Sequence, residues 1–377
     1  MSKQMPIPRR FYSLDVLRGV AALSVVLGHW QHFFFPFNKQ GVTFSLNMEP
    51  MFDALYIFYQ YGGAAVQLFF CLSGFIFFWL YSKRIAEREI TLKSFSVLRI
   101  SRLYPLHFAT LIFVAIGQIA YSNATNTYFV YSFNDSYHFF LNLFFASSWG
   151  FENGFSFNAP IWSVSIEVLL YATFFVFCRL FHRNMIALFV AVIIGHYLLP
   201  KLNGPIANGV ECFFLGGILY LVYERIIKGG DAWKVSIWLP MVAIIVWFVT
   251  IKVGSPNDGF IIGEAPWIMK KIVSAWAVFI LFPVTILSLA LLETRRGTLG
   301  KRLSFFGDIS YSTYLLHFPL QLTTAFIATK LTIDETLYYA PWFMVFYFFV
   351  LISVSLASHR YFEVPMQRYL RLKLNPS

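Results

Sequence analysis

The stretch Phe11–Pro36, which reads FYSLDVLRGVAALSVVLGHWQHFFFP, decides the fold class of this chain. It is long and apolar enough to cross a bilayer as one helix, yet it contains Arg18 and His29. Eleven positions separate these two residues, so they share one helix face and differ in height by about 16 Å. Ionisable groups inside a bilayer are costly and usually mark a functional path. We therefore favour a function for the pair over a snorkelling arginine and a structural histidine.

The rest of the chain has the composition of a membrane protein. Of its 377 residues, 58% are hydrophobic and only 12% are charged, against about 25% charged in soluble domains. The apolar runs are too long for barrel strands, so we expect an all-α polytopic membrane protein, with one transmembrane domain over residues 1–377. The first run is expected to stay as an anchor. Cys71, Cys178 and Cys212 lie in apolar runs, which argues against a disulfide framework or a metal site.

Basic residues gather in alternate loops between the apolar runs, as the positive-inside rule requires. This pattern predicts about ten transmembrane helices with both termini cytoplasmic. Their expected ranges are roughly 13–36, 54–81, 103–121, 161–181, 184–200, 206–224, 234–252, 272–292, 307–329 and 338–360. A further interfacial helix is expected near 137–147. The net charge of +11 is spread over the inner loops without a DNA-binding motif, which excludes nucleic acid as a partner.

The fourth apolar run opens with NAPIWSVSIE, residues 158–167. Pro160 suits a helix start, and Asn158 is a candidate cap. Glu167 and His29 both lie about 10 Å below the outer face by the rise of their helices. A carboxylate beside an imidazole holds its tautomer and raises its basicity, so we predict that Glu167 pairs with His29. The alternative is that Glu167 only ties helices together.

Other polar residues suggest a donor site and a supporting shell. Arg99 and Arg102 share one face if their stretch is helical, and with Arg18 they would form an inner basic cup for phosphates. Ordinary cytoplasmic anchoring is the alternative for these arginines. Asp15 is a candidate partner for Arg18. His317, just before Pro319, is expected to support the site or pack helices, and Glu363 is expected to pair with an inner arginine.

Six motifs, in order along nearly the whole chain, resemble acyltransferase family 3, the membrane-bound carbohydrate O-acyltransferases. They are Arg18 with His29, Ser73-Gly74-Phe75, Arg99 with Arg102 and Pro105, the segment-four motif, the segment-nine motif and the ending Tyr361-Phe362-Glu363 with Pro365. The segment-four motif comprises Asn158, Pro160, Trp162, Ser163, Ser165 and Glu167. The segment-nine motif includes Phe306-Gly307, Ser310, Tyr311, Tyr314, His317 and Pro319. No esterase-like extension follows the last segment, so we expect a stand-alone member.

The resemblance implies an O-acyltransferase of the bacterial inner membrane. It would transfer an acyl group, most often acetyl, from cytoplasmic acyl-CoA to a hydroxyl of a cell-surface or exported carbohydrate. The phosphates of acyl-CoA would bind Arg18, Arg99 and Arg102, and its pantetheine arm would pass Ser73 and Gly74. His29, oriented by Glu167, would act as general base or as nucleophile. The alternative class is a proton-coupled secondary transporter or flippase of a sugar or lipid-linked sugar, with His29 and Glu167 as a proton relay. The absence of detectable repeats weighs against it.

Overall fold

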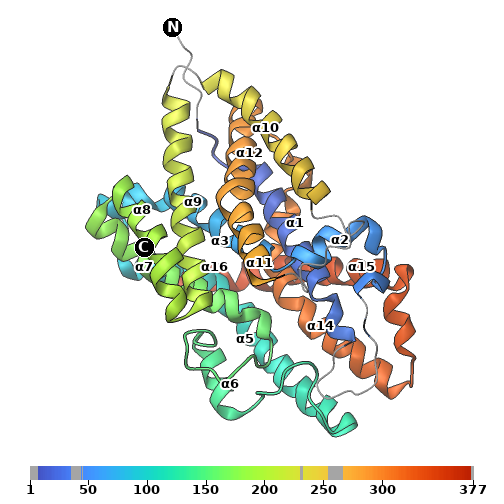
Figure 1. Ribbon diagram of the computed structural model, residues 1–377. Coiled ribbons are helices and arrows are strands. Elements are labelled where there is room, and N and C mark those ends of the chain that lie inside the picture. The colour runs from blue at the N-terminus through green and yellow to red at the C-terminus, as the bar shows by residue number, and fades with distance from the viewer. Residues whose placement is uncertain (1–6, 35–43, 45, 230–231, 254–265, 375–377) are drawn as a thin grey trace. The chain divides into compact units, whose positions relative to one another are not determined.

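The computed structural model describes residues 7–34, 44, 46–229, 232–253 and 266–374. Within these ranges the regular structure is helical throughout, which confirms the all-α prediction (Figure 1). The α-helices are α1 (Tyr12–Gly28), α2 (Phe52–Tyr61), α3 (Ala64–Phe77), α4 (Lys83–Ala86), α5 (Leu92–Thr125), α6 (Ser136–Leu143), α7 (Trp162–Phe181), α8 (Met185–Ile193), α9 (Gly204–Lys228), α10 (Ala232–Val253), α11 (Trp267–Trp276), α12 (Phe282–Arg296), α13 (Phe305–Asp308), α14 (Ser310–Lys330), α15 (Pro341–Ser358) and α16 (Val364–Leu374). Phe35 and Pro36, the end of the first predicted segment, lie outside the described residues.

Seven helical stretches of the described chain are long and apolar enough to cross a membrane. They are Ala64–Ala86, Leu92–Thr125, Ala159–Phe181, Gly204–Lys228, Ala232–Val253, Trp267–Arg296 and Pro341–Leu374. The other three predicted segments fall on α1, on the shorter apolar helix Met185–Lys201 and on α14. The chain is therefore a multi-pass membrane protein. The number of ten spans and the sidedness of the termini stay predictions.

The helices form two compact units. Unit 1 comprises residues up to Val25, then Tyr56–Glu89 and Ala172–Asp308; unit 2 comprises Val26–Leu55, Ile90–Tyr171 and the chain from Ile309 onward. Because α1, α2 and α7 each cross a boundary, neither unit is a continuous stretch of sequence. Each unit is described by itself below.

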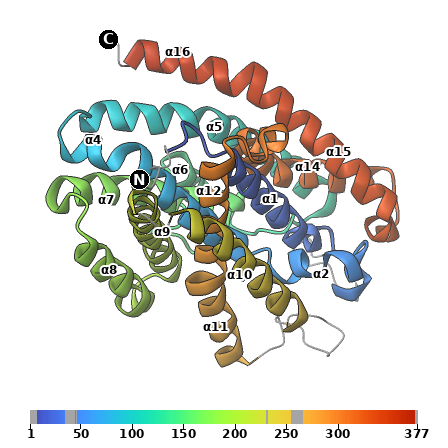
Figure 2. The ribbon, with the colours of Figure 1, turned by 90° about the horizontal axis from the view of Figure 1, so that it is seen from above.

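Unit 1 is held together by close helix packing at glycines. A Cβ atom on Gly74 of α3 would overlap the backbone oxygen of Phe213 in α9, and one on Gly216 of α9 would overlap that of Cys71 in α3. Small residues at such positions let two helix backbones approach, which is a main source of helix association in membranes. In the same unit α10 lies beside α12, as Figures 1 and 2 both show.

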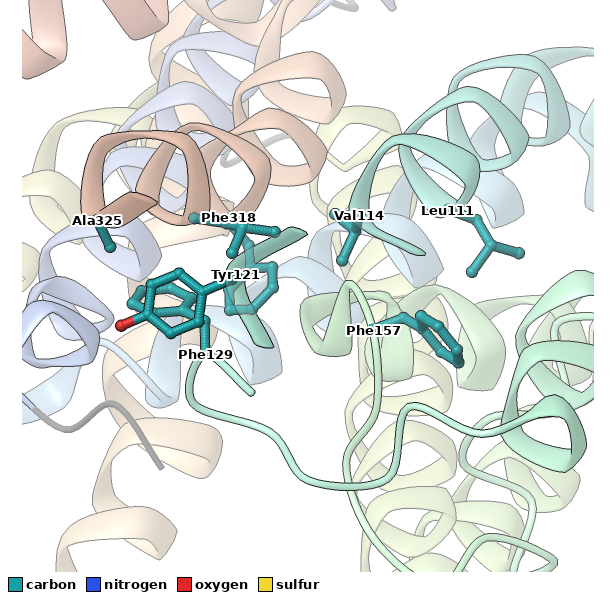
Figure 3. Close-up of a cluster of buried hydrophobic side chains, with 8 residues drawn as sticks. Leu111, Val114, Tyr121, Phe129, Phe157, Phe318 and Ala325 are labelled. Atoms are coloured by element: carbon teal, nitrogen blue, oxygen red, sulfur yellow. The ribbon is translucent and has the colours of Figure 1, made fainter. Parts of the chain in front are cut away.

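Unit 2 is built on the long helix α5, which packs against α14 and α16. Its apolar core joins α5 and α14 to the segment between α5 and α7 (Figure 3). The core residues are Leu111, Val114, Tyr121, Phe129, Phe157, Phe318, Leu322 and Ala325. The Gln118 amide fixes this segment, since it donates to the Phe129 carbonyl at 3.0 Å and accepts from the Phe129 N–H at 2.9 Å.

Several predicted boundaries differ from the structure, among them the end of the last segment, where the helical stretch runs to Leu374 rather than to 360. The segment predicted at 54–81 is two helices, α2 and α3, separated at Gly62 and Gly63. Helix α5 begins at Leu92, well before the predicted start at 103, because Thr91 caps it by accepting from the Ser94 N–H at 3.2 Å. The basic stretch that includes Arg99 is therefore helical. The predicted interfacial helix is α6, which is shorter than expected.

Candidate active site

His29 of unit 2 lies directly after the last residue of α1, where the chain turns into the short 3-10 helix Trp30–Phe33. Its Nδ1 atom is 2.9 Å from Nε2 of His317 in α14. His32 stacks on the His29 ring with centroids 4.6 Å apart and planes 19° apart. The structure therefore gathers three imidazoles, of which the sequence had singled out only His29 and His317.

The hydrogen bonds of His317 fix the tautomers of both rings. Its Nδ1 atom lies 2.6 Å from the carbonyl oxygen of Tyr314, and a carbonyl can only accept, so Nδ1 carries the hydrogen. In a neutral His317 ring the Nε2 atom then carries no hydrogen and accepts. His29 must therefore donate to it from its own Nδ1 atom. The Nε2 atom of His29 consequently carries no hydrogen and keeps its lone pair.

A second series of hydrogen bonds holds the backbone of His29. The Gln321 side chain donates from Nε2 to the His29 carbonyl at 2.8 Å. Its Oε1 atom accepts from Nδ1 of His32 at 3.1 Å, and the Nε2 atom of His32 accepts from the Tyr131 hydroxyl at 3.3 Å. Every donor in this series meets an acceptor, so one set of tautomers satisfies the whole group.

His29 Nε2 has no hydrogen-bond partner among the residues that the structure describes. The His29 side chain is half-buried, whereas His317 and Gln321 are fully buried. His317 is held further by the Tyr347 hydroxyl, which donates to its carbonyl at 2.8 Å. The arrangement presents one unprotonated imidazole nitrogen, fixed from behind, as a general base requires.

Glu167 has a different environment from the one predicted. Its Oε1 atom accepts from the Tyr171 hydroxyl, one turn further along α7, at 2.5 Å. The charges of Glu167, Arg99 and Arg102 all act on that hydroxyl. The buried Arg99 guanidinium also lies 5.9 Å from the centre of the Tyr171 ring. Glu167 thus belongs to an arginine–tyrosine cluster, and the partner of the His29 ring is His317. The equal predicted depth of Glu167 and His29 in the membrane did not determine whether the helix faces that bear them point toward each other.

Arg18 lies in unit 1 with a network of its own. Its Nη2 atom is 3.1 Å from Oδ1 of Asp15, as predicted, and 2.6 Å from the carbonyl oxygen of Gly307. Arg10 bridges Asp15 and Asp308, at 2.6 Å from each. The Arg18 guanidinium is therefore already neutralised and partly satisfied.

Several supporting residues tie α14 to its neighbours in unit 2. The Tyr314 hydroxyl donates to the Pro160 carbonyl and accepts from Ser163, both at 2.7 Å. Asn158 donates to the Leu315 carbonyl at 3.0 Å and makes no side-chain cap, so the predicted capping role was wrong. Tyr311 donates to the Leu103 carbonyl at 2.6 Å.

The remaining predicted residues have packing or local roles. Glu363 accepts from the hydroxyls of Ser312 and Ser358 and makes no ion pair with a described arginine, contrary to the prediction. The Ser165 hydroxyl accepts from the Ser148 N–H at 3.2 Å. Ser310 and Trp162 begin α14 and α7. In unit 1, Ser73 is half-buried in α3, beside the tightly packed Gly74.

A family profile described as an acyltransferase domain matches residues 11–360 of the chain. The chain belongs to acyltransferase family 3. It is similar to "Acyltransferase MdmB" of Streptomyces mycarofaciens, with 33% identity over 176 residues, which cover 46% of this chain and 41% of that protein. It is also similar to "Protein 2 in picA locus" of Rhizobium radiobacter, with 37% identity over 108 residues, 29% of this chain and 46% of that protein. The matched regions span less than half of these relatives. No solved structure matches.

Sequence reasoning had missed His32 and Gln321 in this acyltransferase family 3 chain. Both carried a usable signal. His32 follows His29 by three positions, and Gln321 follows His317 by four, the spacings that bring side chains together on a helix. Tyr131 had no such signal, because its place depends on the path of the long segment after α5.

Proposed function

We propose that this protein is a membrane O-acyltransferase. It transfers an acyl group from acyl-CoA to a hydroxyl of an exported or cell-surface carbohydrate, and acetyl is the acyl group that we propose. The transfer takes place across the bacterial inner membrane. Family membership and the similarity to a protein named an acyltransferase support the reaction class. The observation that carries the chemistry is the direction of the hydrogen bond from His29 to His317, which leaves a basic nitrogen for the acceptor.

In the proposed reaction, the hydroxyl of the acceptor gives its proton to Nε2 of His29 as its oxygen attacks the thioester carbonyl. The carbon–sulfur bond then breaks, the CoA thiolate leaves, and the imidazolium returns the proton to the thiolate. The ester, free CoA and neutral His29 are the products. His317 supports each step because the hydrogen bond at Nδ1 stabilises the positive charge that develops on the His29 ring.

The donor phosphates are proposed to contact cationic side chains at the predicted cytoplasmic side. In unit 2, Arg102 is exposed and makes no hydrogen bond or ion pair with a described residue, so it is available to an anion. Arg99 is buried against Phe95 and Tyr171 and would orient the site. In unit 1, the role of Arg18 in donor binding would require it to share its guanidinium between Asp15 and a phosphate.

A covalent route uses the same atom. Nε2 of His29 would attack the thioester itself and form an acyl-imidazole, which the acceptor hydroxyl then cleaves. Rapid quenching with acetyl-CoA carrying a labelled acetyl group, with and without acceptor, separates the routes. Label on His29 in the mixture without acceptor supports the acyl-enzyme. No label on His29 in either mixture, at a time when product forms in the one with acceptor, supports direct transfer.

The experiment that tests the function follows thiol release by the purified protein in lipid vesicles with acetyl-CoA and a panel of soluble and lipid-linked sugars. Wild type is compared with His29→Ala and with the control His182→Asn. His182 is exposed and has a positive φ of 56°, which asparagine adopts readily. Acceptor-dependent release in wild type and control, and its loss in His29→Ala, supports the proposal. No acyl-CoA binding and no release in the wild type would exclude it.

A further inference from the structure

A cavity of about 450 Å³ lies within unit 1, and none of its lining residues belongs to the histidine group. Four chain segments meet at it: the start of the described chain, the π-helical turn after α3, the residue Arg183 after α7, and the last part of α9. Its lining includes Arg9, Trp79, Lys83, Arg183, Tyr220 and Glu224. The volume is within the range of small-molecule sites.

The charges around this cavity do not balance. Three cations, Arg9, Lys83 and Arg183, line it with one carboxylate, Glu224. Glu224 is already neutralised, because its oxygens lie 2.6 Å from Arg183 and 3.4 Å from Lys228. Lys83 lies 3.8 Å from Glu87, which does not line the cavity, so Arg9 is the lining cation without a carboxylate partner among the described residues. An anion in the cavity would neutralise it.

Two of the cations have unused donors. Arg9 makes no hydrogen bond or ion pair with any residue described. The Nε atom of Arg183 is buried and lacks a hydrogen-bond partner, even though its Nη2 atom is bonded to Glu224. A buried guanidinium N–H without a partner is costly, and a phosphate oxygen is a strong acceptor for it.

Aromatic rings complete the lining. The Arg183 guanidinium lies 5.5 Å from the centre of the Tyr220 ring, a cation–π contact that helps to hold it in place. Trp79 is half-buried, with its indole anchored by the Phe11 ring at 4.8 Å. A half-buried indole next to Arg9 and the unbonded Nε atom of Arg183 suits a ligand that carries a planar base and a phosphate.

We propose that this cavity binds the nucleotide end of acyl-CoA, an adenosine phosphate, through Arg9, Lys83 and Arg183. The identification of the ligand rests on the proposed function. All four lining segments lie at ends of predicted transmembrane helices that the pattern of basic residues places in the cytoplasm. Acyl-CoA is available on that side of the membrane. All lining residues belong to unit 1, so this site is an alternative to Arg99 and Arg102 for the adenosine phosphates of the donor. A phosphate can also come from an anionic lipid headgroup, so the experiment separates the two sources.

The first experiment measures binding of adenosine 3′,5′-bisphosphate, the probe, to the full-length protein in phosphatidylcholine nanodiscs by titration calorimetry. Arg9→Ala and Lys83→Ala together should weaken binding about tenfold or more, since each hydrogen bond to a charged group is worth that much. Lys93→Ala is the matched control, because this lysine is exposed at the start of α5 and does not line the cavity. Binding to the double variant equal to that of wild type would overturn the proposal.

The lipid arm repeats the titration in nanodiscs that contain phosphatidylglycerol. Nucleotide binding that persists there supports the proposal. Failure of the nucleotide to bind in either lipid, together with phosphatidylglycerol retention that the double variant loses, would assign the cavity to a lipid headgroup and overturn it.

A kinetic arm distinguishes failure of this site from failure of the proposed function. Thiol release is measured with acetyl-CoA and with S-acetylpantetheine, a thioester donor that lacks the nucleotide. The preference for acetyl-CoA, as a ratio of kcat/KM values, should fall about tenfold or more in the double variant. An unchanged ratio overturns the nucleotide site while leaving the acyltransferase intact, whereas no thiol release from either donor in wild type contradicts the function itself.

Discussion

The Nδ1 atom of His29 lies 2.9 Å from the Nε2 atom of His317, although 288 positions separate the two residues in the chain. The contact puts a buried ring, itself fixed by the Tyr314 carbonyl, behind a half-buried one. In many hydrolases and transferases a carboxylate holds this position behind the catalytic histidine. Here a neutral imidazole accepts the hydrogen bond, so it fixes the tautomer without placing a full negative charge in the membrane.

Replacing His317 tests this positioning role. His317→Ala removes the acceptor and should lower kcat by about 10²–10⁴-fold with little change in KM for the donor, because the general base loses its orientation. His317→Gln places an amide oxygen near the position of Nε2 and should recover part of the rate. The pH dependence of kcat should also shift in both variants, since the partner of the titrating ring has changed. A purely structural role for His317 would lower the yield of folded protein and leave that pH profile unchanged.

Glu167→Gln distinguishes the observed environment from the predicted one. The amide still accepts from Tyr171 but removes a negative charge beside Arg99 and Arg102. We expect kcat to fall by less than about tenfold and KM for acyl-CoA to change, because the charge acts on the arginine cluster. Tyr171→Phe is the matched variant and should change KM in the same sense. A loss of kcat as large as that of His317→Ala would return Glu167 to the catalytic role.

The helical class, most segment positions and the Arg18–Asp15 contact could be predicted from the sequence, because each depends on local spacing or on hydropathy. The partner of the His29 ring could not. Depth in the membrane follows from counting residues, but the direction in which a helix face points depends on packing between distant segments. Glu167 satisfied the depth argument, but its carboxylate bonds Tyr171, and the packing of α14 places His317 beside His29.

Gly74 illustrates the same limit, and its substitution provides a third test. The sequence placed Gly74 on the path of the donor, whereas the structure places its α-carbon against the backbone of Phe213. Gly74→Ala should separate α3 from α9 and lower the melting temperature by several degrees or abolish folding, because the clash is with backbone rather than with a flexible side chain. Gly63→Ala is the control, since a Cβ atom there meets nothing within 4 Å. A Gly74→Ala protein that melts like wild type but binds acyl-CoA poorly would support the donor path instead.

Glu49 predicts a pH dependence of stability that has no connection with catalysis. Its side chain is 3% exposed, its Oε2 atom has no hydrogen-bond partner in the described chain, and burial raises its pKa from 4.5 to about 8. The folded protein therefore keeps this proton while the unfolded chain releases it, so stability falls as pH rises from about 4 to about 8 and then levels off. Glu49→Gln removes the cost of charging the buried group. The melting temperature of the variant should exceed that of wild type by several degrees near pH 9, and the difference should shrink toward pH 5. Asp53→Asn, exposed in the first turn of α2, should show no such trend. A difference between Glu49→Gln and wild type that stays constant across this range would mean that Glu49 is paired or hydrated in the folded protein, and that burial does not control its proton.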